Sequence, residues 1–132
     1  SNDLTQSLLA LYRNTPRVAE LFKETHPAVI SALRDVARAA RAERKPIGIC
    51  GEFAGTPAGA VLCMAMGFDV LSMNATNLPR VKWVIRNIKR REARQMLSDV
   101  LKMGTTAEVD RYVRERMVEL GLGRVLPSHA SD

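Results

Sequence analysis

Cysteine and histidine are both scarce in this sequence of 132 residues. The two cysteines, Cys50 and Cys63, form no CxxC pair and have no histidine at a metal-ligand spacing. This pattern argues against a disulfide framework and against a zinc site, and it is typical of a protein with reduced thiols. Neither histidine belongs to a catalytic pattern, because His26 precedes a helix-starting proline and His129 lies among the final residues.

Long apolar runs are missing as well. No run approaches the roughly 18 apolar residues that a membrane span needs, and no charged-then-apolar segment of the secretory type opens the chain. Repeats and low-complexity linkers are also absent. With 46% hydrophobic and 26% charged residues, the composition is typical of one globular domain with a modest core. We therefore expect a soluble cytoplasmic protein without a membrane partner.

Charge of one sign dominates, since the formal net charge is +6. Much of the excess comes from a basic cluster of Lys82, Arg86, Lys89, Arg90, Arg91 and Arg94. Such a cluster can contact nucleic acid or another polyanion, which would make the chain a stand-alone basic interaction module. Apolar residues alternate with these cations at helical spacing, namely Val81, Val84, Ile85 and Ile88. This pattern favours another interpretation, in which the cations form the solvated face of an amphipathic helix.

Helices separated by two short strands are the predicted secondary structure. Helical periodicity places helices at residues 4–11, 18–22 and 27–45, the last carrying Val29, Leu33, Val36 and Ala40. Residues 47–50 and 68–73 are short, apolar and bounded by Pro or Gly, which is typical of buried strands. Between them, Thr56-Pro57 predicts the start of a helix that ends at Gly67, with one inward face of Ala58, Val61, Leu62 and Ala65.

This order of strand, helix and strand predicts a parallel crossover unit and hence an α/β fold. Pro79 opens the basic helix, and the next helix presents Ala93, Met96, Leu97, Val100 and Leu101. After Gly104, Thr105 and Glu108 predict a capping box for a last helix that Gly121 ends, with Val109, Val113, Met117 and Leu120 inward. Residues 126–132 are predicted to be a flexible tail.

Candidate reactive groups follow both predicted strands. In parallel α/β folds the chemistry lies at the carboxyl ends of the strands. Cys50 ends the first strand ahead of a glycine-flanked turn that contains Glu52, and Ser72-Met73-Asn74 ends the second. A lone cysteine in an apolar strand is more often an inert core residue. Cys63, on a small apolar helical face, is predicted to be such a core residue.

Several stretches carry a resemblance to a known family: SNDLTQ at 1–6, ICGEFAG at 49–55, FDVLSMNATNLPRVKWVIR at 68–86 and the final pair of helices. Together they resemble the C-terminal part of the phosphoenolpyruvate-utilising enzymes, in particular enzyme I of the bacterial phosphotransferase system, the phosphoenolpyruvate-protein phosphotransferase. The resemblance leans towards the nitrogen-related branch without separating it from the sugar branch. Pyruvate phosphate dikinase-like and phosphoenolpyruvate synthase-like enzymes are the alternatives within the same superfamily.

The resemblance implies a fold, a (β/α)8 barrel of about 250 residues. Residues 1–125 then form the C-terminal half of that barrel, helix-rich with two or so short parallel strands. The first strands, two phosphate-binding arginines, a metal-binding glutamate and a domain with the phosphorylated histidine would lie elsewhere in a longer protein. We therefore expect the chain to be inactive alone and, because a cut barrel exposes sheet edges and apolar faces, to form a homodimer.

The resemblance also implies roles for four residues. Asn2 resembles the amide that binds the phosphate of phosphoenolpyruvate, Asp3 the carboxylate that holds Mg²⁺ and contacts the substrate, and Arg13 the guanidinium that grips the phosphate. From the residues alone, Asp3 is better explained as a helix N-cap that forms a capping box with Gln6, and Arg13 as a solvated cation at a helix end. Both interpretations stay open.

Cys50 resembles the acid that delivers a proton to C3 of enolpyruvate. A thiol, with an ordinary pKa of about 8.5, is a reasonable proton carrier near neutral pH. Glu52 either orients that thiol or forms a salt bridge. The implied partners are phosphoenolpyruvate, pyruvate and a histidine-containing phosphocarrier protein, with no nucleic acid.

Overall fold

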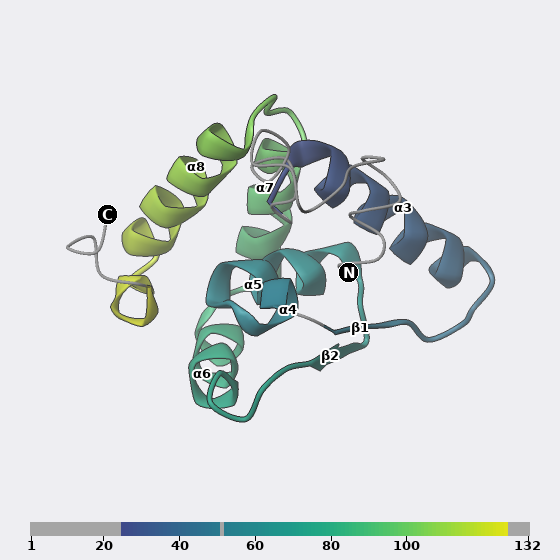
Figure 1. The fold of residues 1–132 in the computed structure, drawn as a ribbon, viewed down its shortest axis with the longest axis horizontal. Helices are drawn as coiled ribbons and strands as arrows, with labels where there is room; N and C mark the ends of the chain where they lie inside the picture. Colours follow the sequence, from purple (N-terminus) through teal and green to yellow (C-terminus); the bar gives the residue numbers. More distant parts are fainter. Residues whose placement is uncertain (1–24, 51, 127–132) are drawn as a thin grey trace, which may run out of the picture.

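The computed structural model describes residues 25–50 and 52–126 (Figure 1). In this part of the chain, six α-helices, two β-strands and one short 3-10 helix follow one another. The helices predicted at 4–11 and 18–22 and the residues of the predicted tail after Leu126 lie outside the described residues. In chain order the elements are α3 (Pro27–Ala42), β1 (Gly48–Cys50), α4 (Glu52–Gly55), α5 (Pro57–Met66), β2 (Val70–Ser72), α6 (Leu78–Asn87), α7 (Arg90–Val100), α8 (Thr106–Glu119) and η2 (Gly123–Val125).

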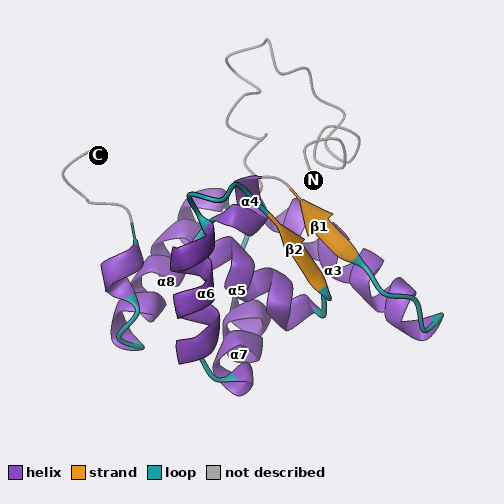
Figure 2. Cartoon of the chain, turned by 90° about the horizontal axis from the view of Figure 1, so that it is seen from below, coloured by secondary structure: helices purple, strands orange, loops and turns teal. Residues whose placement is uncertain are grey.

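The two strands pair in parallel, with α5 as the crossover between them (Figure 2). Asp69 fixes the start of the pairing, because its backbone N–H donates to the Ile47 carbonyl at 2.8 Å and its Oδ2 accepts from the Ile47 N–H at 2.9 Å. The helix-rich α/β class with two short parallel strands is therefore confirmed. Both strands are shorter than predicted, at three residues each.

The central helix is α5, which contacts α3, α4, α6, α7 and α8. Both predicted ends are confirmed: the Thr56 hydroxyl accepts from the Gly59 N–H at 3.0 Å, and Gly67 ends the helix with a φ of 101°. The predicted face of Ala58, Val61, Leu62 and Ala65 is only part of what α5 buries, because no residue of this helix is exposed. Helices pack around it, so apolar side chains are needed on every side.

Helix α3 begins where Pro27 predicted, but its cap is a residue that sequence reasoning passed over. The His26 Nδ1 accepts from the Ala28 N–H at 3.1 Å and so satisfies one of the free donors of the first turn. The face predicted from Val29, Leu33, Val36 and Ala40 was partly wrong, since Val36 is 42% exposed. The buried stripe is instead made by Val29, Ile30, Leu33 and Ala37.

The basic cluster lies on two helices, and its interpretation as a solvated surface is confirmed. All six side chains of the cluster are exposed. Ile88 and Lys89 separate α6 from α7, and the Glu92 Oε1 accepts from the Lys89 N–H at 2.8 Å. Apolar Val84, Ile88 and Ala93 are buried beneath this bend, so the helices share the core while the cations face solvent.

Helices α7 and α8 complete the core as the sequence predicted. Ala93, Met96, Leu97 and Val100 are buried on α7, and Val109, Val113 and Met117 are buried on α8. Thr105 caps α8 by accepting from the Glu108 N–H at 3.1 Å, and Gly121 follows its end with a φ of 80°. Cys63 is fully buried and is a core residue. Within 25–50 and 52–126, the helices are too short or too polar to cross a membrane.

A hydrogen bond from the Tyr112 hydroxyl to the Asp99 carboxylate joins α8 to α7. This bond lowers the pKa of Asp99 below its ordinary value of 3.8. Burial, together with the nearby carboxylate, raises the pKa of Tyr112 to about 12. Both shifts favour the state in which the Asp99 carboxylate is charged and the Tyr112 hydroxyl keeps its proton.

Replacing Tyr112 with phenylalanine should therefore lower the free energy of unfolding by about 1 kcal/mol, since the acceptor is charged but partly solvated. The Asp99 contribution is present above its ordinary pKa and is lost as pH falls through the lowered one. The Tyr112 contribution is present below pH 10 and is lost as pH rises towards 12. Urea unfolding should give a wild-type minus variant difference that is flat between about pH 5 and 9 and shrinks on both sides. A difference that persists unchanged at pH 3 and at pH 12 would contradict this assignment.

Candidate active site at the carboxyl edge of the strands

The carboxyl edge of the two-stranded sheet brings the two predicted reactive segments together. Cys50 is the last residue of β1 and Ser72 the last residue of β2, and the two are register partners. The backbone therefore places Cys50 beside the Ser72-Met73-Asn74 segment, as expected from parallel pairing. Figure 2 shows both strands ending on the same side, next to α4.

The segment after Cys50 was predicted as a turn, but it forms the single helical turn α4. Local hydrogen bonds account for the difference. The Phe53 carbonyl accepts from the Thr56 N–H at 3.2 Å and from the Thr56 hydroxyl at 2.9 Å. Phe53 and Ala54 are buried, so the chain that leaves the edge is fixed to the core at once. The described residues on either side of this position, the strand β1 and the helical turn α4, thus both belong to the packed part of the fold.

The loop after β2 packs against α4 and supplies a residue that sequence reasoning missed. A Cβ built at Gly55 would lie 3.0 Å from the Asn77 side-chain nitrogen and 3.3 Å from the Met73 Cβ. Asn77 precedes α6 but makes no capping bond with its side chain. Its amide is therefore placed toward the carboxyl edge. The signal in the sequence was Gly55 itself, because a glycine inside a helical turn often marks a close approach.

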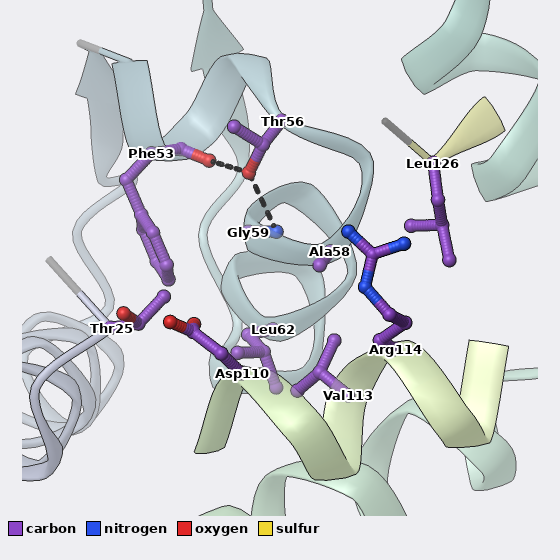
Figure 3. Close-up of a pocket in the computed structure, with 10 residues that line it drawn as sticks. All are labelled: Thr25, Phe53, Thr56, Ala58, Gly59, Leu62, Asp110, Val113, Arg114 and Leu126. Atoms are coloured by element: carbon purple, nitrogen blue, oxygen red, sulfur yellow. Dashed lines mark hydrogen bonds between the residues drawn. The ribbon is translucent and has the colours of Figure 1, made fainter. Parts of the chain in front are cut away.

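A cavity of about 240 Å³ lies next to this edge, between the α4–α5 junction and α8 (Figure 3). Phe53, Thr56, Gly59 and Leu62 line one wall, whereas Asp110, Val113 and Arg114 line the other. Figure 3 shows the Asp110 carboxylate toward Thr25 and the Arg114 guanidinium toward Leu126. The cavity is mainly apolar, and none of its lining residues was predicted as a site residue.

Three of the four predicted site residues, Asn2, Asp3 and Arg13, lie outside the described residues. Of the fourth, Cys50, the backbone position is described. Among the residues that the structure describes, no three His, Cys, Asp or Glu side chains gather into a group that could hold a metal ion.

Comparisons with known proteins extend over almost the whole chain. Residues 1–90 match the family model described as PEP-utilising enzyme, PEP-binding domain. The chain is 37% identical over 122 residues to a phosphoenolpyruvate-protein phosphotransferase of Haemophilus influenzae, covering 92% of this chain and 21% of that protein. It is 35% identical over 126 residues to an Escherichia coli protein named phosphoenolpyruvate-dependent phosphotransferase system, covering 96% and 17%.

A phosphoenolpyruvate-protein phosphotransferase of Geobacillus stearothermophilus is also similar, with 35% identity over 114 residues, 86% of this chain and 20% of that protein. The chain thus spans about a fifth of the length of the curated relatives that it matches. The family match covers α3, both strands, α5 and α6, and the relatives also match α7 and α8 along most of the chain. The resemblance noted from the sequence is confirmed.

Proposed function

The chain belongs to the PEP-utilising enzymes, in their PEP-binding domain, and we propose that it supplies part of the substrate site of a phosphoenolpyruvate-protein phosphotransferase. The observation that carries this proposal is the position of Cys50 in the ICGEFAG segment. It ends β1 opposite Ser72 and precedes a helical turn that is fixed to the core. Relatives that align with most of this chain, at 35% to 37% identity, carry the phosphotransferase name.

The role we assign to Cys50 is that of a proton donor. When the phosphoryl group leaves phosphoenolpyruvate for an enzyme histidine, enolpyruvate remains. In its enolate form, a lone pair of the C2 oxygen becomes the C2=O bond while the electron pair of the C2–C3 double bond forms a C3–H bond with the thiol proton; the S–H bond breaks, and pyruvate and a thiolate result. Solvent returns a proton to the thiolate. The rigid surroundings of the edge serve this step because general acid catalysis depends on a positioned donor.

Substrate binding falls, in this proposal, to residues near the start of the chain. Asn2 and Arg13 bind the phosphate, since an amide and a planar guanidinium both donate to phosphate oxygens. Asp3 contributes one carboxylate to a Mg²⁺ ion whose other ligands come from a longer protein. When bound, the ion neutralises charge on the phosphate.

The described architecture supports half of a barrel as the wider fold. Two adjacent parallel strands with a helical crossover are the repeating unit of a (β/α)8 barrel, and Val70 on β2 is 57% exposed. We propose that the remaining strands come from a longer cytoplasmic protein, which passes the phosphoryl group to a histidine-containing phosphocarrier protein. Exposed strands and apolar side chains also favour a homodimer, for which sedimentation equilibrium showing only monomer would be the contrary result.

The chain by itself is expected to bind phosphoenolpyruvate weakly, because only part of the proposed ligand set is present. Calorimetry should detect no binding with a Kd below about 1 mM. Mixing the chain with a separately produced upstream part of a relative should restore phosphorylation of the histidine by phosphoenolpyruvate. Tight binding to the isolated chain would contradict the shared site, and failure of a folded, associated mixture to react would contradict the function.

A further inference from the structure

A cleft of about 520 Å³ opens at the end of α5 opposite to the carboxyl edge of the strands. Two helices line it with residues spaced to share one face each. The residues on α3 are Arg34, Arg38 and Arg41, those on α7 are Arg94 and Ser98, and Lys102 follows α7 in the next turn. Ala65 and Met66, from the last turn of α5, lie between the two rows.

The positive charge of this cleft is not balanced by any acidic residue among those that line it. Five of them are cationic and none is acidic, although the chain contains 14 acidic residues. Like charges across a cleft repel one another and lower the stability of the folded state. The nearby carboxylates are few: Asp35 pairs with Arg34 at 3.1 Å, and Asp99 attracts Lys102 from beside the cleft. Folding alone therefore does not account for the arrangement.

Part of the cleft is held in place by packing. A Cβ at Gly67, whose φ is 101°, would collide with the Arg41 guanidinium, so that this arginine lies directly on the glycine. Arg34 keeps only 26% of its side chain exposed and lies 3.5 Å from the Ser31 hydroxyl. Buried Met66 and Leu97 form an apolar base. Packing thus holds Arg34 and Arg41 at the cleft, whereas Arg38, Arg94 and Lys102 are exposed side chains around it.

We propose that this basic cleft binds a small anion that carries linked phosphate groups. Guanidinium groups match phosphate oxygens in pairs, and the Ser98 hydroxyl adds a neutral donor. Three arginines on α3, together with Arg94 on α7 and Lys102 after it, suit several linked phosphates better than one. Since α5 is ten residues long, about 15 Å separates the cleft from the carboxyl edge. The cleft is therefore a second anion site, separate from the one proposed for phosphoenolpyruvate.

Calorimetry with tripolyphosphate at physiological ionic strength tests the proposal on the 132-residue chain. Saturable binding of one anion per chain is expected. The double variant Arg38→Glu/Arg94→Glu should weaken it at least about tenfold, because it removes one cation from each row and adds repulsion. Chemical-shift changes in the wild type should centre on the amides of Ala65, Gly67 and Ser98.

The matched control is Arg86→Glu/Arg111→Glu, which changes the net charge equally at two exposed arginines outside the cleft. Its affinity should stay within about twofold of wild type. Equal weakening in both double variants, or shifts spread over the whole surface, would assign the binding to general charge and overturn the proposal, as would the absence of saturable binding. Circular dichroism confirms that both variants are folded.

Comparison of ligands identifies the source of the phosphates. ATP binding more tightly than tripolyphosphate would support a nucleotide, and equal affinities would support recognition of the phosphate chain alone. If an oligonucleotide bound more tightly than ATP or tripolyphosphate, and both double variants weakened that binding equally, the proposal of an anion site in the cleft would be contradicted. This test does not involve Cys50, so its outcome is independent of the proposed phosphotransferase function.

Discussion

Replacing Cys50 with alanine in the complete enzyme is expected to abolish the exchange of the C3 protons of pyruvate with deuterated solvent. Histidine should still be phosphorylated by phosphoenolpyruvate, because phosphoryl transfer precedes protonation and needs no thiol. A positioned general acid contributes about 10²- to 10⁴-fold, so exchange should fall by at least two orders of magnitude. The two half-reactions are measured on one preparation, by NMR for exchange and by radiolabelled phosphoenolpyruvate for phosphorylation.

Cys63→Ala is the matched control, since it removes the same thiol from a fully buried position in α5. It should cost roughly 1 kcal/mol of stability and leave the ratio of exchange to phosphorylation unchanged. If Cys50 were only a packing residue, Cys50→Ala would show this same pattern. Exchange at the wild-type rate in a folded Cys50→Ala enzyme would eliminate the proton-donor role.

Gly59→Ala should destabilise the chain by about 3 kcal/mol, despite the better helix propensity of alanine. The added Cβ would overlap the Phe53 carbonyl oxygen and lie 2.7 Å from the Thr56 Oγ1. These two atoms form the hydrogen bond that joins α4 to α5, at 2.9 Å. The backbone carbonyl has little freedom to move, so the clash must be relieved by separating the two helices. Urea unfolding measures the change.

Gly104→Ala provides the comparison, because the nearest atom to its built Cβ is the Glu108 Oε1 at 4.0 Å. That substitution should leave the free energy of unfolding within about 0.5 kcal/mol of wild type or raise it slightly. Similar effects at the two glycines would show that the α4–α5 junction is looser than its contacts indicate. If only Gly59→Ala lowers the free energy of unfolding, the tight contact between α4, which follows Cys50, and α5 contributes to the stability of the core.

Helix ends were the part of the fold that the sequence predicted best. Thr56 and Thr105 cap helices, and Gly67 and Gly121 end them, as their residue types indicated. These features depend on one or two turns of backbone and on the side chain at a single position. The parallel pairing followed from the crossover of α5, which is also a local pattern.

Features that depend on which elements meet were predicted less well. Val36 has apolar neighbours at helical spacing, yet it is exposed because α3 meets α5 along a different stripe. The short helix α4 depends on hydrogen bonds to Thr56, which no propensity of its four residues indicates. The basic cleft draws its cations from two segments of the chain, since Arg41 and Arg94 are 53 positions apart, so no single segment contained its signal.

Sequence patterns predicted only part of the candidate site. The position of Cys50 at a carboxyl edge followed from strand order, and the structure confirms that position. The roles of Asn2, Asp3 and Arg13 came from family resemblance and stay predictions. Asn77 was missed because its proximity to Gly55 depends on the loop after β2, whose path periodicity does not determine.

The packing of α5 against helices on several sides limits which substitutions its residues can accept during evolution. The outer helices each keep a solvent-facing half where substitutions are tolerated, whereas in α5 no residue is exposed and only Ala58, Met64 and Ala65 are partly so. Its ten residues can change only among small and apolar types of matching volume, since each neighbour limits the space on one side. Among distant homologues, α5 should therefore keep its apolar character after the surfaces of α3, α6, α7 and α8 have diverged.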